Sequence, residues 1–175
     1  EVFIPNEEIR EEFIRSIKNG SRKELVKAVE LSDKLLRATI NKDESTVAEI
    51  IGEAHQANTS PKFYNNEQAL RSVVIMAYLS SVDDYIRFEE LASGKGYIDL
   101  LFLPALQSSK PALIIELKWN KSAEKAVQQE QDQQYWKFAK QFRYKGKILL
   151  VGINYNSKTK KHTCKIKEIE SLEKN

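Results

Sequence analysis

The stretch ALIIELKW, residues 112–119, has the composition of a buried β-strand that carries two charged side chains. It is almost continuously apolar through Ile115, which is typical of a strand covered on both faces. Glu116 and Lys118 are two positions apart, so both side chains point to the same side of the strand. Burying an unpaired charge is costly, so these two residues require partners or a functional role.

The segments around this strand predict a mixed sheet. Two strands precede it, at about 85–91 and 97–103, with a turn at Ser93-Gly94-Lys95-Gly96. A long helix follows at about 122–142, and two more strands at about 147–154 and 162–169. The short connections favour an antiparallel meander of the first three strands, and the long helix is a crossover that makes the fourth strand parallel to a neighbour.

The residues before the sheet predict helices. Apolar residues with helical spacing occur at about 6–19, 21–36 and 45–57, and the segment from 65 or 66 to 80 is apolar nearly all round. The predicted fold class is therefore α/β, a restriction-endonuclease-like mixed sheet with a β-meander, a crossover helix, further strands and a helical N-terminal part.

Composition limits the classes of protein to which the chain can belong. With 41% hydrophobic and 30% charged residues in 175, it can bury a core, and no apolar run approaches the length of about 20 needed to cross a bilayer. The single Cys164 cannot form an intramolecular disulfide, so we expect a reducing, cytoplasmic location. The chain begins at Glu1 without a signal-like segment, so we expect it to be part of a longer polypeptide.

Asp99 adds a second carboxylate to the predicted site. It lies in the strand before Glu116 and can come opposite that residue in an antiparallel pair. Two adjacent carboxylates repel each other unless a cation lies between them, and a hard divalent metal such as Mg²⁺ fills that role. Lys118 could then polarise a water or a phosphate oxygen. The alternative is an ion-pair cluster at the end of the sheet.

The motifs, taken in this order, resemble those of the PD-(D/E)XK nuclease superfamily. The resemblance is strongest to the branch found C-terminal to AAA-ATPase-like domains in bacterial proteins. The matching residues are 64–67 (YNNE), Glu90, 93–99 (SGKGYID), 112–119, Ala126, Gln129, Tyr135 and 151–155 (VGINY). The resemblance covers about residues 45–170. It implies a helical lead-in or linker over 1–44, which joins an upstream domain, and a nuclease-like domain over 45–175.

The resemblance implies a role for each matching residue. Asp99 and Glu116 would hold Mg²⁺ or Mn²⁺, and Lys118 would orient or activate the attacking water. Glu67 and Glu90 match acidic positions near the metal, and Gln129 and Tyr135 match residues of the helix that follows the Glu-x-Lys motif. The implied function is metal-dependent hydrolysis of phosphodiester bonds in nucleic acid, with DNA as the first candidate and an ATPase-like domain upstream as a partner.

The basic residues predict contact with nucleic acid. Residues 137–175 hold 11 basic and 3 acidic residues, and such a stretch favours phosphate backbones, although charge alone more often marks a solvated surface. The predicted contact residues are Lys95, Lys121, Lys158, Lys160 and Lys161. The alternative function is a non-catalytic module that binds nucleic acid or a protein and serves the upstream domain.

Several residues also have ordinary structural interpretations. An acidic residue such as Glu67 is favoured in the first turn of a helix by the helix dipole alone. Gln129 belongs to a glutamine stripe that is usually found on a surface, and Tyr135 has the character of a core residue. Glu130 falls on the predicted core face of its helix, which indicates either a local irregularity or a turn that faces solvent. His55 and His162 are too far apart in sequence to form a local metal motif.

Overall fold

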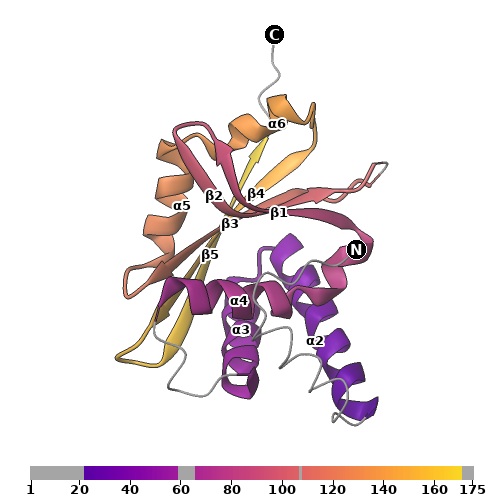
Figure 1. Ribbon diagram of the computed structural model, residues 1–175, viewed down its shortest axis with the longest axis vertical. Helices are drawn as coiled ribbons and strands as arrows, with labels where there is room; N and C mark the ends of the chain where they lie inside the picture. The colour runs from indigo at the N-terminus through magenta and orange to yellow at the C-terminus, as the bar shows by residue number, and fades with distance from the viewer. Residues whose placement is uncertain (1–21, 59–65, 107, 171–175) are drawn as a thin grey trace.

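The computed structural model describes residues 22–58, 66–106 and 108–170. A five-stranded sheet lies between two layers of helices (Figure 1). On one side pack α2 (Arg22–Ile40), α3 (Glu44–Asn58) and α4 (Glu67–Ala77), followed by the short helix η1 (Leu79–Asp83). On the other side packs α5 (Ala123–Asp132). The helix predicted at 6–19 lies outside the described residues. No helix within the described ranges is long and apolar enough to cross a membrane.

The strands follow the predicted order. They are β1 (Tyr85–Ser93), β2 (Gly96–Pro104), β3 (Ala112–Trp119), β4 (Lys147–Asn156) and β5 (Lys161–Glu170), and each is the neighbour of the next in the sheet. β1, β2 and β3 form an antiparallel meander, β3 and β4 are parallel, and β4 and β5 are antiparallel. The predicted fold class and the crossover are therefore confirmed.

Strand β3 is covered on both faces, as its apolar sequence predicts. Leu113, Ile115 and Leu117 face the cluster formed with α2, α3 and α4. Ala112 and Ile114 face the second cluster, beneath α5. Because side chains alternate along a strand, Glu116 and Lys118 fall on the α5 side. The strand thus carries its two charged side chains into the layer between the sheet and α5.

The long helix predicted at 122–142 is interrupted. After α5 the chain continues as the short helices η2 (Tyr135–Lys137) and α6 (Phe138–Gln141), and Gln134 adopts a left-handed φ of 58°. The tip of the β1–β2 hairpin docks at this break, where the Lys95 N–H donates to the Gln133 carbonyl at 2.9 Å. Residues 120–145 contain no glycine or proline that would have indicated the interruption. The hairpin contact, which the local sequence does not encode, accompanies the break.

Candidate active site

Asp99 and Glu116 are brought together by the pairing of β2 with β3. Leu100 pairs with Ile115 at the end of the β2–β3 ladder, and Asp99 and Glu116 are the next residues of the two strands. Asp99 Oδ2 accepts a hydrogen bond of 2.8 Å from the backbone N–H of Leu117, which fixes the carboxylate beside β3. The predicted arrangement of two adjacent carboxylates is therefore present.

Glu116 lies at the centre of this arrangement and is only 2% exposed. Its Oε1 accepts hydrogen bonds from Lys118 Nζ at 2.6 Å and from Gln129 Nε2. Its buried Oε2 has no hydrogen-bond partner among the described residues. Burial, and then the charge of Asp99, raise the pKa of Glu116 to about 7, although Lys118 acts in the opposite direction. The carboxylate therefore has one bound oxygen and one oxygen that lacks a donor or cation.

Gln129 reaches Glu116 because α5 packs very closely on β4. Gly152 is the β4 residue beside Glu116, and a Cβ atom there would lie 2.2 Å from the carbonyl oxygen of Ala123. Only glycine allows the helix to approach this near. Gln129 Nε2 also lies 3.2 Å from the Tyr135 hydroxyl, so the two predicted residues form a chain of hydrogen bonds that ends on Glu116. Gln129 is therefore not part of a surface stripe.

Arg71 is a member of the site that sequence reasoning missed. Its guanidinium donates to Asp99 Oδ1 at 3.1 Å and to Glu90 Oε1. Arg71 lies one helical turn after Glu67 on α4, and this i, i+4 spacing was the available sequence signal. Glu67 makes no hydrogen bond to Asp99 or Glu116 among the described contacts, but its charge contributes to the raised pKa of Glu116.

Glu90 occupies an unusual position in β1. On either side of it, Glu89 pairs with Leu100 and Leu91 pairs with Ile98. Glu90 and Asp99 stand between these pairs and are not themselves paired. Glu90 has a left-handed φ of 51°, and its side chain is 67% exposed. A non-glycine residue in this region costs about 1–3 kcal/mol, and such strain concentrates at functional sites. The β1–β2 ladder is thus interrupted beside the carboxylate pair.

A comparison with family models bears on this geometry. The model described as PD-(D/E)XK nuclease superfamily matches residues 65–165, a range that spans α4, the whole meander, α5 and most of the last two strands. The chain belongs to the PD-(D/E)XK nuclease superfamily. No curated protein matches the sequence. The carboxylates of Asp99 and Glu116 and the amine of Lys118 occupy the matched part of the chain.

PD-(D/E)XK nucleases usually use divalent metals, and the carboxylate pair fits such an ion. Glu116 Oε2 is buried without a partner, and Mg²⁺ is commonly bound through one or two carboxylates with water completing the shell. In the described ranges, no group of three or more His, Cys, Asp or Glu side chains is arranged to hold a metal ion. The predicted ligands Glu67 and Glu90 are therefore not gathered with Asp99 and Glu116, and their contact with metal stays a prediction.

Glu130 is buried on the core face of α5, which extends regularly from Ala123 to Asp132. Neither an irregularity nor a solvent-facing turn accounts for it. It is 0% exposed, and neither carboxylate oxygen has a hydrogen-bond partner among the described residues. Burial, and then the charge of Glu116, raise the pKa of Glu130 well above its usual value, although the nearby backbone of Val151 acts in the opposite direction. This PD-(D/E)XK domain thus holds a second buried carboxyl group one residue from Gln129.

The predicted nucleic-acid contacts fall in two places. Lys158, Lys160 and Lys161 are exposed at the β4–β5 turn, and Lys121 is exposed just after β3, at the same edge of the sheet. Lys95 is exposed at the tip of the β1–β2 hairpin, against the break after α5. Other basic residues of the C-terminal stretch form ion pairs. Lys147 pairs with Glu168 and Lys165 with Glu44.

His55 and His162 meet although 106 residues separate them in the sequence. Their ring centroids are 5.1 Å apart, and both rings contact Tyr155. Burial, and then the charge of His55, lower the pKa of His162 to about 4. The pairing depends on α3 packing against β5, a contact that local sequence spacing cannot predict.

Replacing Arg71 with methionine is expected to lower the metal-free unfolding free energy by about 1–3 kcal/mol, because Asp99 loses a charged hydrogen bond. Mn²⁺ should then raise the melting temperature more in the variant than in the wild type, since the carboxylates have lost their guanidinium partner. Thermal melts with chelator and with Mn²⁺ measure both effects.

Arg87→Met is a matched control, because Arg87 is also partly buried and pairs with Glu89 at 3.3 Å, away from Asp99. It should leave the response to Mn²⁺ unchanged. An equal response to Mn²⁺ in Arg71→Met and wild type would mean that the arginine and the metal do not compete for Asp99.

Proposed function

We propose that this domain hydrolyses phosphodiester bonds of nucleic acid, with DNA as the first candidate, in a divalent-metal-dependent reaction. The observation that carries the proposal is the buried Glu116, which is adjacent to Asp99, hydrogen-bonded to Lys118, and left with one oxygen without a partner. Membership of the PD-(D/E)XK nuclease superfamily supports the same reaction class. The sequence resemblance further suggests an upstream ATPase-like partner, and the single Cys164 suggests a reducing, cytoplasmic location.

The two carboxylates would hold the metal, Asp99 from β2 and Glu116 from β3. When bound there, a divalent ion supplies Lewis-acid polarisation of the phosphoryl oxygen and lowers the pKa of a bound water. Asp99 is kept in place by the Leu117 N–H at 2.8 Å and by Arg71 at 3.1 Å. These contacts leave carboxylate lone pairs for a further ligand.

Lys118 places a cation beside the carboxylates. Its side chain is 7% exposed and Nζ lies 2.6 Å from Glu116 Oε1. From that position the ammonium can donate to a water or a phosphate oxygen and stabilise charge that develops in the transition state. Gln129 and Tyr135 hold the other side of Glu116, so we assign them as positioning residues that act through this carboxylate.

A metal titration with a nuclease assay tests the proposal. The chain is incubated with single-stranded DNA, duplex DNA and RNA, in chelator and in increasing Mg²⁺ or Mn²⁺. We expect cleavage only with metal, and saturation of the rate with metal concentration. If no substrate is cleaved at any metal concentration while the oligonucleotides still bind, the non-catalytic binding module replaces the nuclease as the better description.

The turn lysines should contribute to non-specific affinity. Changing Lys158, Lys160 and Lys161 to glutamine removes up to three phosphate contacts, which should reduce the slope of log affinity against log salt by about 2–3 for duplex DNA. Fluorescence anisotropy of a labelled duplex in chelator, at several salt concentrations, measures the slope. Lys27→Gln with Lys34→Gln on the exposed side of α2 is the control, and should leave the slope unchanged. An unchanged slope in the triple variant would make these lysines solvated surface.

A further inference from the structure

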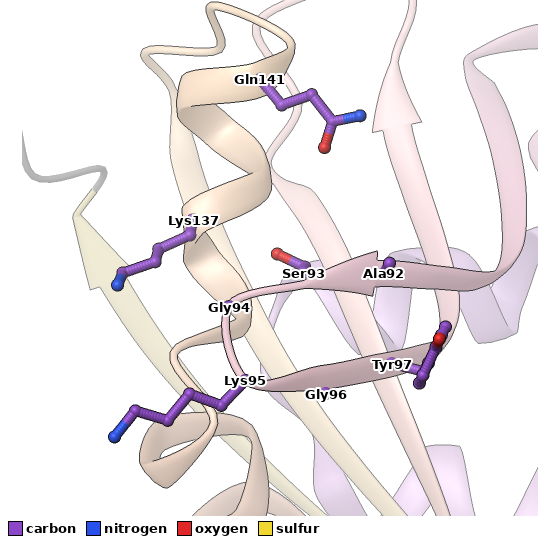
Figure 2. Close-up of a pocket in the computed structure, with 8 residues that line it drawn as sticks. All are labelled: Ala92, Ser93, Gly94, Lys95, Gly96, Tyr97, Lys137 and Gln141. Carbon is purple, nitrogen blue, oxygen red and sulfur yellow. The ribbon is translucent and has the colours of Figure 1, made fainter.

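A hollow of about 440 Å³ lies between the tip of the β1–β2 hairpin and the η2–α6 segment (Figure 2). Lys95, Tyr97, Lys137 and Gln141 line it with side chains that can contact a ligand. In Figure 2 the two lysine side chains extend in the same direction at one end of the hollow, whereas Tyr97 lies towards its other end. A ring at one end and two cations at the other suit a ligand with a flat apolar part and an anionic part.

The walls of this hollow are fixed to each other. The Lys95 N–H donates to the Gln133 carbonyl at 2.9 Å, and Ser93 Oγ donates to the Tyr135 carbonyl at 2.9 Å. Gly94 has a φ of +58°, and a Cβ atom there would lie 2.1 Å from Gln133 O. The hairpin tip is therefore held against the helix break by backbone contacts, so that the hollow exists before any ligand arrives.

Tyr97 is the largest exposed aromatic surface of this region. Tyr97 is 67% exposed, in contrast to Tyr135 nearby, which is 1% exposed. An exposed aromatic ring in a basic hollow is the combination with which proteins hold single-stranded nucleic acid, because bases stack on the ring while cations contact the phosphates. A base that is stacked and paired within a duplex does not offer its face to such a ring.

The hollow adjoins the candidate active site through β2. Tyr97 and Asp99 are two residues apart on β2, a separation of roughly 7 Å along the strand. Gly96, which lines the hollow, also packs close to the site, because a Cβ atom on Gly96 would lie 3.2 Å from the Tyr135 hydroxyl, which contacts Gln129. A strand that passes Asp99 can therefore place a neighbouring nucleotide in the hollow.

We propose that this hollow binds a nucleotide of single-stranded nucleic acid, with the base stacked on Tyr97 and the adjoining phosphates contacted by Lys95 and Lys137. The inference deepens the proposed nuclease function and rests on it for the nature of the substrate. It assigns single-stranded or locally unpaired nucleic acid as the form that the domain holds beside its carboxylates. Gln141, which lines the hollow from α6, offers an amide that can hydrogen-bond to the nucleotide.

Binding in chelator tests the proposal without any cleavage. Labelled oligo-dT, oligo-rU and a DNA duplex are titrated with the chain, and anisotropy gives the affinities. Tyr97→Ala should weaken binding of the single strands by about tenfold or more, the effect of losing one base–aromatic stack. It should leave duplex affinity within about twofold. Tyr97→Phe, which keeps the ring, should retain wild-type affinity within about twofold, since the phenyl face is sufficient for stacking.

Lys95→Gln with Lys137→Gln should weaken single-strand binding and reduce the salt slope by about 1.4, which corresponds to two phosphate contacts. The control is again Lys27→Gln with Lys34→Gln, which removes the same charge from α2. Unchanged single-strand affinity in Tyr97→Ala would overturn the proposal, as would an equal loss for duplex and single strand.

The result of the Tyr97→Ala binding test can be distinguished from the result of the nuclease assay. If Tyr97→Ala shows no binding defect while metal-dependent cleavage occurs, the hollow is rejected and the nuclease function stands. If the single-strand defect appears in a chain that cleaves nothing, the hollow stands and the nuclease function is rejected.

Discussion

Glu116→Gln is expected to reduce metal-dependent cleavage by about a thousandfold or more, with the fold retained. The carboxylate is the buried member of the proposed metal pair, and losing several kcal/mol of transition-state stabilisation has an effect of this size. Glutamine keeps the shape of the side chain and an oxygen that can accept from Lys118 and Gln129, so the hydrogen bonds around Oε1 can persist. Single-turnover cleavage at saturating Mn²⁺ measures the loss.

Glu124→Gln is the matched control, because Glu124 is an exposed glutamate in the first turn of α5. It should cleave at the wild-type rate. Lys118→Met should independently reduce the rate by about a hundredfold or more, as expected when a positioned proton donor or cation is removed, and Lys125→Met on the exposed side of α5 is its control. Wild-type cleavage by folded Glu116→Gln and Lys118→Met would place the active site elsewhere.

Glu130→Met is expected to raise the unfolding free energy at neutral pH by about 1–3 kcal/mol. A buried polar group without hydrogen bonds carries a desolvation cost of that order, and methionine fills a similar volume without polar atoms. Glu130 is 0% exposed with both oxygens unpartnered among the described residues. Chemical denaturation at pH 7 gives the free energy, and Glu124→Met on the exposed side of the same helix should produce little change.

The pH dependence separates the charge of Glu130 from its polarity. Because the folded-state pKa is raised above the usual value of 4.5, the folded chain holds this proton more tightly than the unfolded chain. Stability from this group is therefore present below about pH 4.5 and is lost as pH rises above it, by at most about 1.4 kcal/mol per pH unit. In Glu130→Gln that contribution disappears, so the stability gap between variant and wild type should widen from pH 5 to pH 8. A constant gap would mean that Glu130 is not buried as a titrating group.

The parts of the site that the sequence predicts are those fixed by strand geometry. Alternation along ALIIELKW places Glu116 and Lys118 on one face, and the tight Ser93–Gly96 turn and the loop after β2 bring Asp99 beside β3, near Glu116. The meander and the carboxylate pair were predictable because side chains alternate every two residues along a strand and because short connections join neighbouring strands.

The parts that escaped prediction depend on how helices dock. Arg71 reaches Asp99 only because α4 packs against the sheet at β3, and Gln129 reaches Glu116 only because Gly152 allows α5 to approach β4. A glutamine or glutamate on a helix indicates a surface until the packing partner is known, so Gln129 and Glu130 both had surface interpretations. The meeting of His55 with His162 has the same cause.

The parallel pairing of β3 with β4 also determines when the site forms during folding. The β1–β2 and β4–β5 hairpins join strands that are close in the chain, and isolated hairpins form in about 1–10 μs. β3 can pair with β4 only after residues 120–146 have closed into the crossover, which costs more chain entropy. Gln129 lies within this crossover segment and reaches Glu116 where α5 packs on β4 beside Gly152.

We therefore expect the Glu116–Gln129 contact to form after the folding transition state. Substitutions at these two positions should change the rate of unfolding and leave the rate of folding nearly constant. In stopped-flow experiments on Gln129→Ala, the unfolding arm of the plot of rate against denaturant should shift, and the refolding arm should stay in place. The side chains that define the chemistry could then be exchanged for others without delaying the assembly of the sheet that carries them.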